Sequence, residues 1–374
     1  MNPIDHDFAR LHTIGWRACF EPALREAHAA LALDNPALAA PPPLRLVEIH
    51  RDALRLHDGR AQHAARAAPR LRRALAARDG ALAVGDWVLA TPGPGGALWV
   101  HARLAPRNHL VRRDADGRRH PLVSNVDAAL FLMGLDADFN LRRIERYLLL
   151  VAGSGVQPVV VLTKADLVAP APAMREAVVA DEIDALCARL GGGVPVLAVD
   201  GRSPEAALRL APWLAPGHAA VLLGSSGAGK STLTNTLAAR TLQDTGPVRV
   251  HDQRGQHTTT ARSLHLLPGG ACVIDTPGLR ALRPDADEAA LSAGFEDIAR
   301  LALRCRFRDC RHAGEPGCAV GAEVAPDRVR NYHKLLRETR RDTLGALDRQ
   351  RLRAQWKARG RDGAQRARMK RGEC

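Results

Sequence analysis

The most informative segment of the sequence reads Gly224-Ser225-Ser226-Gly227-Ala228-Gly229-Lys230-Ser231-Thr232. It follows the apolar run Ala219 to Leu223 and precedes a helical pattern, which together predict a strand, a glycine-rich loop and a helix. The glycines allow a tight turn whose N–H groups point at phosphate oxygens, and the helix N-terminus adds partial positive charge. We therefore expect a phosphate-binding loop, in which Lys230 reaches the β and γ phosphates and the Ser231 hydroxyl ligates magnesium. A plain glycine turn is the alternative, and the Lys-Ser pair after a strand disfavours it.

A second apolar run, Ala271 to Ile274, ends in the tetrapeptide Asp275-Thr276-Pro277-Gly278. In a phosphate site the Asp275 carboxylate would hold magnesium through water, and the Gly278 N–H would face the γ phosphate. Alone the tetrapeptide could be a Pro-Gly turn, but its place after a buried strand favours the magnesium role. The polar loop 254–260 between the two motifs is expected to supply a magnesium-binding threonine. Thr258 and Thr259 are candidates, and the sequence does not choose between them.

A base-recognition motif, Thr163-Lys164-Ala165-Asp166, follows the apolar run Val159 to Leu162. Asp166 can accept hydrogen bonds from N1 and N2 of guanine, a donor pair that adenine lacks, and the stem of Lys164 can cover the base plane. Asn usually holds the first position of this motif, where this chain has Thr163. The segment Asp200-Gly201-Arg202-Ser203 falls where a final base-contacting loop would sit. Because the base motif precedes the phosphate loop, and not the reverse, the order indicates a circularly permuted nucleotide-binding domain.

These motifs, in this order, resemble the circularly permuted ribosome-assembly GTPases of the RsgA (YjeQ/EngC) family over residues 44 to 345. The resemblance implies hydrolysis of GTP to GDP and phosphate in late maturation of the small ribosomal subunit, with rRNA binding and stimulation by the subunit. The glutamine that orients water in many GTPases is replaced here by Leu279, which cannot do so. By resemblance, His257 of the switch loop is the candidate for this catalytic role, and an RNA or solvent contact is the alternative.

The zinc candidate is the set Cys305, Cys310, His312 and Cys318, whose spacing matches that family's zinc motif at every ligand. Three thiolates and one imidazole form a closed tetrahedral structural site, so we expect one zinc per chain. A disulfide cluster is the alternative. It is disfavoured because the sequence shows no secretory signal, and clustered cysteines in a cytosolic protein more often bind metal.

The expected fold is multidomain: an N-terminal β-barrel of the oligonucleotide-binding (OB) type, a central circularly permuted α/β phosphate-loop domain and a C-terminal α-helical zinc region. The barrel is inferred from short strand-like runs separated by turn residues, at 44–49, 87–90, 98–102 and 109–112. The expected divisions are an extension at 1–43, the barrel at 44–122, the permuted domain at 123–284, the zinc region at 285–345 and a basic tail at 346–374.

Charge is concentrated at the C-terminal end of the chain. The formal net charge is +14, and residues 328–374 contain sixteen Lys or Arg against five Asp or Glu. Such a segment suits a polyanion, with phosphate contacts favoured over base stacking, although a solubilising tail is the alternative. No uninterrupted apolar span suits a membrane, so we expect a soluble protein without a membrane partner. We also expect the protein to be cytoplasmic and to act as a monomer.

Two other functional classes also fit the sequence. One is a phosphate-loop ATPase with another substrate, and the other is a zinc-containing RNA-binding switch protein with little turnover. Nucleotide competition tests the first, and turnover with and without ribosomal subunits tests the second.

Overall fold

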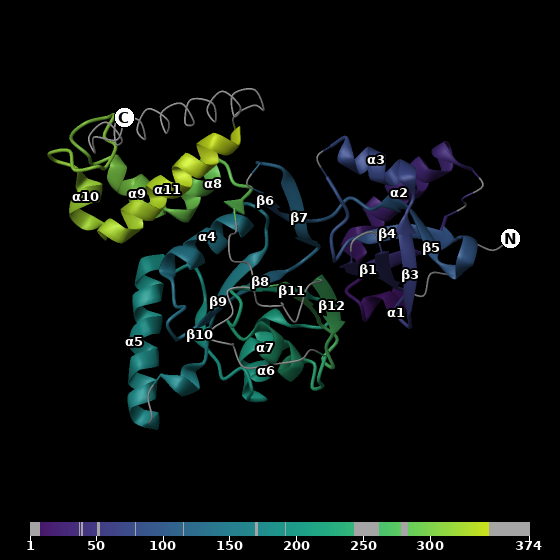
Figure 1. Ribbon diagram of the computed structural model, residues 1–374, viewed down its shortest axis with the longest axis horizontal. Coiled ribbons are helices and arrows are strands. Elements are labelled where there is room, and N and C mark those ends of the chain that lie inside the picture. Colours follow the sequence, from purple (N-terminus) through teal and green to yellow (C-terminus); the bar gives the residue numbers. More distant parts are fainter. Residues whose placement is uncertain are drawn as a thin grey trace, which may run out of the picture. The chain divides into compact units, whose positions relative to one another are not determined.

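The chain divides into two compact units, Met1–Asp285 and Ala286–Cys374. The structure is a computed structural model that describes residues 8–343 apart from 37, 39, 51–52, 79, 115, 169–170, 191, 243–261 and 278–282 (Figure 1). The basic tail expected at 346–374 therefore lies outside the described residues. None of the described helices combines the length and apolar content needed to cross a membrane.

A closed five-stranded barrel forms the N-terminal part of the first unit. Its strands follow the order β1-β2-β3-β5-β4, and β4 pairs again with β1 to close the ring. The pairing of β3 with β5 is parallel and the others are antiparallel. The strands are β1 Pro43–His50, β2 Ala53–His57, β3 Gln62–Ala67, β4 Trp87–Pro92 and β5 Leu98–Arg103, with helix α3 Pro69–Ala76 between β3 and β4.

The described part of the N-terminal extension is helical and packs against the barrel. It contains α1 Phe8–His12, the short 3-10 turn η1 Ala18–Phe20 and α2 Glu21–Asp34. Trp16 and Trp87 are both buried and meet edge to face, with ring centroids 4.8 Å apart. This aromatic contact helps to hold the extension against β4 of the barrel.

The central sheet has the strand order β10-β9-β8-β11-β13-β12. Neighbouring strands are parallel except for β12, which runs antiparallel to β13 and also pairs with β1 of the barrel. The strands are β8 Ala128–Gly134, β9 Gln157–Thr163, β10 Val196–Ala198, β11 Ala219–Gly224, β12 Arg262–Leu266 and β13 Cys272–Asp275. Two buried apolar clusters cover the two faces of this sheet, as expected where helices flank parallel strands.

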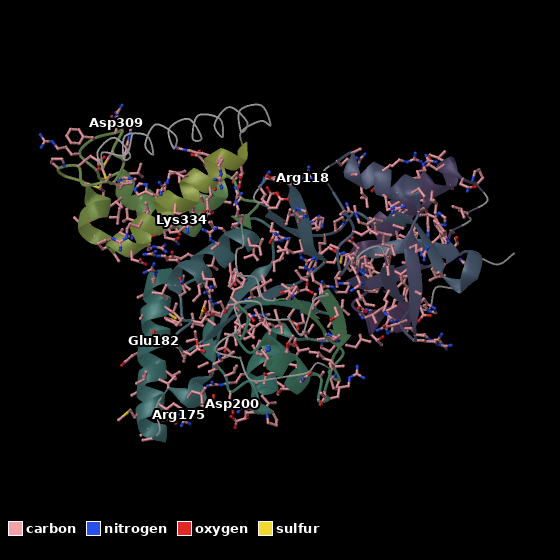
Figure 2. The ribbon with its side chains drawn as sticks, in the orientation of Figure 1. Arg118, Arg175, Glu182, Asp200, Asp309 and Lys334 are labelled. Atoms are coloured by element: carbon pink, nitrogen blue, oxygen red, sulfur yellow. The ribbon has the colours of Figure 1, made fainter. Side chains whose placement is uncertain are left out.

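Helices and short 3-10 turns connect the strands of this sheet (Figure 1). They are α4 Leu141–Val151, η3 Ala165–Leu167, α5 Pro172–Leu190, α6 Glu205–Leu210, η4 Ala211–Trp213 and α7 Lys230–Leu237. Arg175 and Glu182 lie along α5, and Asp200 follows β10 (Figure 2). In chain order β8, β9 and β10 come before β11, yet β11 lies between β8 and β13, which is the permuted arrangement that the motif order predicted.

One expected barrel strand lies elsewhere. The run at 109–112 forms β6 His109–Arg113, which pairs with β7 Arg119–Ser124 and β14 Arg283–Pro284 in a separate three-stranded sheet. Its hydrogen-bonding edges are occupied by these two strands, and Leu110 packs into the core of the central sheet. The prediction that this run belongs to the barrel is therefore wrong.

The second unit is helical. Its helices are α8 Glu288–Gly294, α9 Glu296–Ala302, α10 Ala319–Glu323 and α11 Pro326–Thr343. Arg328 of α11 makes two hydrogen bonds of 2.7 Å with the Asp297 carboxylate of α9, and its guanidinium lies over the Phe295 ring, 4.6 Å from the centroid. The loop between α9 and α10 carries the cysteines, so the helices form a frame on which this loop is held.

Candidate functional site

The phosphate loop has the conformation that its sequence predicts. Strand β11 ends at Gly224 and helix α7 begins at Lys230. A Cβ atom at Gly224 would lie 2.7 Å from the Leu132 carbonyl oxygen of β8, so only glycine fits this approach between strands. Gly227 and Gly229 have φ of 81° and 85°, in the left-handed region that glycine adopts without strain. The backbone between β11 and α7 thus forms a tight turn at a helix N-terminus.

Lys230 is buried within the turn of this loop. Its Nζ donates to the carbonyl oxygens of Gly224 and Ser225, at 3.1 and 2.6 Å. Burial lowers the pKa of Lys230, while the Coulombic attraction of Asp275 and Asp138 opposes that shift. A desolvated ammonium group held by loop carbonyls interacts strongly with an anion that enters the same turn, because screening by water is weak there.

Asp275 lies at the same edge of the sheet. It is the last residue of β13, is 1% exposed, and pairs in register with Leu222 of β11. The Thr276 hydroxyl donates to the Leu222 carbonyl oxygen at 2.7 Å, which fixes the end of β13 against β11. Together with the Ser231 hydroxyl in the first turn of α7, the Asp275 carboxylate offers the oxygen ligands that magnesium prefers.

The base-recognition motif reaches this site from the other side of β8. Thr163 ends β9 and is 2% exposed, and its hydroxyl donates to the Ala228 carbonyl oxygen of the phosphate loop at 2.9 Å. Lys164 has φ of 59°, and its Nζ contacts Asp136 Oδ2 at 2.5 Å. Asp166 lies in the short turn η3, and no described residue bonds its carboxylate, which leaves it able to accept from a ligand.

Several expected site residues cannot be placed. His257, Thr258, Thr259 and Gly278 lie outside the described residues, as does Leu279. The structure brings together the phosphate loop, Asp275 and the base-recognition motif, and it adds two acidic residues that the sequence reasoning missed. These are Asp136 and Asp138, in the loop between β8 and α4. An Asp-x-Asp pair directly after a buried strand was the signal that could have identified them.

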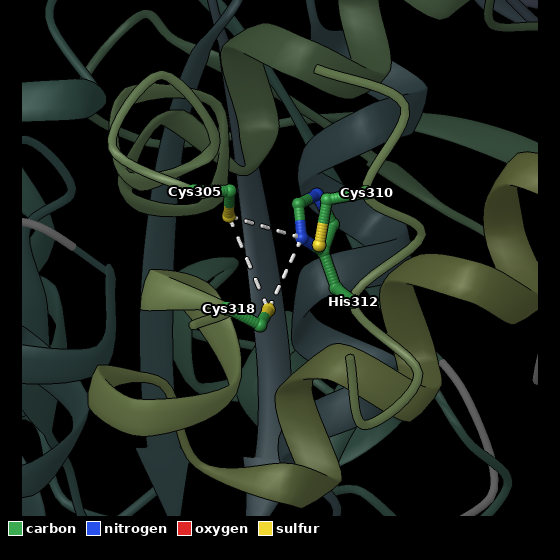
Figure 3. A group of neighbouring side chains, drawn as sticks. All are labelled: Cys305, Cys310, His312 and Cys318. Carbon is green, nitrogen blue, oxygen red and sulfur yellow. Dashed lines mark hydrogen bonds between the residues drawn. The ribbon is translucent and has the colours of Figure 1, made fainter. Parts of the chain in front are cut away.

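The four expected metal ligands converge in the second unit (Figure 3). His312 Nδ1 lies 3.6 Å from the Cys305 sulfur and 3.5 Å from the Cys318 sulfur, and these two sulfurs are 4.0 Å apart. All four ligand atoms, including that of Cys310, lie within 4.8 Å of one another. The Gly321 N–H donates to the Cys318 sulfur at 3.2 Å, which orients this ligand. The cluster could hold one metal ion.

Comparisons with known proteins identify relatives of this chain. A family model described as RsgA GTPase matches residues 104–284. A relative from Xanthomonas axonopodis pv. citri (strain 306), the small ribosomal subunit biogenesis GTPase RsgA, is 44% identical over 347 residues, covering 90% of this chain and 91% of its own. The protein of the same name from Xanthomonas oryzae pv. oryzae (strain MAFF 311018) is 44% identical over 344 residues, with 90% of each chain covered.

Two solved structures share the fold. YjeQ from Thermotoga maritima has a TM-score of 0.53 and 23% identity, covering 79% of this chain and 98% of its own. YloQ, described as a circularly permuted GTPase, has a TM-score of 0.52 and 21% identity, covering 81% of this chain and 96% of its own. At these identities the likeness concerns the fold alone.

Proposed function

The chain belongs to the RsgA GTPase family, and from this premise we propose that it hydrolyses GTP while acting on the maturing small ribosomal subunit. The observation that carries the proposal is the 44% identity, over nine-tenths of both chains, to proteins named for biogenesis of that subunit. Its substrates are then GTP and water, its products GDP and phosphate, and its place of action the cytoplasm. We also propose that the chain acts as a monomer, with one copy bound to each subunit.

Catalysis in this proposal depends on positioning and charge. Lys230 and the N–H groups of the phosphate loop bind the phosphates, and they stabilise the charge that develops on the γ phosphoryl oxygens. Ser231 and Asp275 would hold magnesium, which supplies further neutralisation of phosphate charge when bound. Because Leu279 cannot orient water, His257 is the residue that we propose for this task.

Guanine recognition is assigned to Asp166. Its carboxylate, which has no partner among the described residues, fits the N1 and N2 donors of guanine, and adenine lacks that donor pair. The buried Thr163 hydroxyl donates to the Ala228 carbonyl oxygen, so Thr163 stabilises the phosphate loop and does not contact the base. Asp166 then determines which base is preferred. Lys164 would cover the base with its apolar stem.

The metal in the second unit is proposed to be zinc, one ion per chain. Ligand atoms around a tetrahedral zinc, with Zn–S of about 2.3 Å and Zn–N of about 2.0 Å, lie about 3.5 to 3.8 Å apart. The distances of 3.5, 3.6 and 4.0 Å between His312, Cys305 and Cys318 fit this geometry. A closed set of three thiolates and one imidazole leaves no open position for a substrate, so the zinc role is structural.

Contacts with rRNA are proposed for the barrel, the zinc-binding loop and the basic tail. The formal net charge of +14 favours a polyanionic partner. In the zinc-binding loop Arg306 and Arg308 are exposed, and the Arg306 guanidinium lies 5.6 Å from the centroid of the exposed Phe307 ring. Arginines beside an exposed ring suit contacts to both phosphates and unpaired bases.

Co-sedimentation tests the proposed partner directly. Full-length protein loaded with a non-hydrolysable GTP analogue should pellet with purified small subunits in a one-to-one ratio, and GDP should weaken this binding. Competition by ATP, measured in parallel, should be negligible. Equal pelleting with small and large subunits, or displacement of GTP by equimolar ATP, would contradict the proposal.

A further inference from the structure

The loop at residues 135–140 lies between the two halves of the proposed nucleotide site. It leaves the C-terminal end of β8, which is paired on one side with β11 and on the other with β9. Gly134 is in register with Thr163, and the Leu135 N–H donates to the Thr163 carbonyl oxygen at 3.0 Å. Parallel strands end at one edge of the sheet, so this loop emerges between the phosphate loop and the base-recognition motif.

Each half of the site is held by one carboxylate of this loop. Asp136 Oδ2 accepts from Lys164 Nζ at 2.5 Å, and Asp138 accepts from the Ser225 hydroxyl of the phosphate loop. The Asp138 N–H in turn donates to Asp136 Oδ1 at 3.0 Å. The two acidic side chains are therefore parts of one hydrogen-bonded loop, and Asp136 uses one oxygen to shape the loop and the other to hold Lys164.

Lys164 requires such an anchor. Its φ of 59° places a non-glycine residue in the left-handed region, which costs free energy unless surrounding contacts compensate. A lysine side chain also has several rotatable bonds, and fixing it costs rotamer entropy. The ion pair with Asp136 offsets part of the rotamer cost before any ligand arrives, because it selects one direction for the side chain. The exposed fractions of 27% for Lys164 and 33% for Asp136 leave the pair accessible to a ligand.

We propose that Asp136 is a positioning residue for nucleotide binding: its carboxylate holds Lys164 so that the apolar stem of this lysine covers the guanine plane. The proposal rests on the nucleotide site described under the proposed function. It assigns Asp136 no contact with the reacting phosphates. Because covering a base plane does not read its edge, Asp136 contributes to affinity for the nucleotide, and Asp166 determines which base is preferred.

The substitution Asp136→Asn tests this role with little change in shape. The carboxamide that it introduces can still accept the Asp138 N–H with its oxygen, so the loop is retained, but it turns an NH₂ group toward Lys164. With full-length protein and fluorescent mant-GDP, we expect the dissociation constant to rise roughly three- to ten-fold, the loss expected for a partly exposed charge-assisted contact. At saturating GTP, kcat should stay within about two-fold of wild type, since phosphate contacts are unchanged. The ratio of GDP to IDP affinity should also be unchanged, because Asp166 still reads the base edge.

A double-mutant cycle separates positioning from a general structural role. In a Lys164→Ala background, Asp136→Asn should no longer weaken mant-GDP binding, because the side chain it positions is gone. Glu182→Gln, a matched carboxylate-to-amide change on α5 (Figure 2), serves as the control and should bind mant-GDP like wild type.

Three results would overturn the proposal. The first is an affinity for mant-GDP that Asp136→Asn leaves unchanged. The second is tighter mant-GDP binding in Asp136→Asn, which would mean that the ion pair holds Lys164 away from the base. The third is a loss of mant-GDP affinity from Asp136→Asn that is equally large in the Lys164→Ala background. Wild-type protein provides the remaining distinction. If it binds GDP no better than ADP, the proposed function is wrong and the positioning role is wrong with it. If it prefers GDP while Asp136→Asn has no effect, only the positioning role fails.

Discussion

Replacing Thr163 by valine should loosen the phosphate loop without changing its sequence. Valine has nearly the same shape as threonine, so Thr163→Val removes the hydroxyl and creates no cavity. The lost hydrogen bond is the one of 2.9 Å to the Ala228 carbonyl oxygen, and both residues are 2% exposed, so water cannot easily replace the donor. Removing the donor from a buried acceptor costs about 1 to 3 kcal/mol.

Amide hydrogen exchange measures this cost where it occurs. At about 1.4 kcal/mol per factor of ten, protection of the N–H groups in residues 224–233 should fall about five- to hundred-fold in Thr163→Val, and mant-GDP should dissociate faster. Thr163→Ser, which keeps the hydroxyl, should retain more of the protection than Thr163→Val. If Thr163→Val exchanges within two-fold of wild type throughout this segment, the assignment of Thr163 as a support for the phosphate loop is wrong.

Three further predictions concern other parts of the chain. Cys310→Ser should lower the zinc content below one ion per chain and unfold residues 286–343 locally, while GDP binding persists. The reason is that structural zinc contributes about 10 to 16 kcal/mol of apparent binding free energy. Elemental analysis measures the zinc content, and circular dichroism measures the loss of helix. Deleting residues 346–374 should weaken binding to small subunits and flatten its salt dependence, since fewer phosphates are neutralised, which binding at several salt concentrations would show. Burial lowers the pKa of His109 to about 4. As the pH falls from about 6.5 toward 4, His109 is therefore protonated in the unfolded chain before it is protonated in the folded protein, and the free energy of unfolding decreases. In His109→Gln this free energy, measured by urea denaturation at several pH values, should decrease less over the same pH range.

The phosphate loop and the cysteine cluster could be predicted because their signals are local. Glycines at fixed offsets before Lys230 define a turn, and the spacing from Cys305 to Cys318 brings four ligands into one short loop. Strand β9 could also be predicted from its sequence, because strands in a parallel sheet are covered on both faces and form continuous apolar runs.

Pairing between distant segments could not be predicted in the same way. The assignment of β6 to the barrel failed because its partners, β7 and β14, include a strand more than 160 residues further along the chain. Strand β3 carries Arg66 among alanines and lacks the β-branched residues that mark a strand. Asp136 was missed because its partner Lys164 becomes a neighbour only through the parallel pairing of β8 with β9.

GTP turnover in the presence of purified ribosomal subunits is the decisive test of the proposed activity and partner. Full-length protein is assayed alone, with small subunits and with large subunits, and Lys230→Ala provides the background rate in each case. We expect slow turnover alone, clear acceleration by small subunits and little by large subunits, because Leu279 replaces the usual water-orienting glutamine and an activator is needed to complete the site. Turnover that small subunits leave unchanged, or that large subunits raise equally, would contradict the proposal.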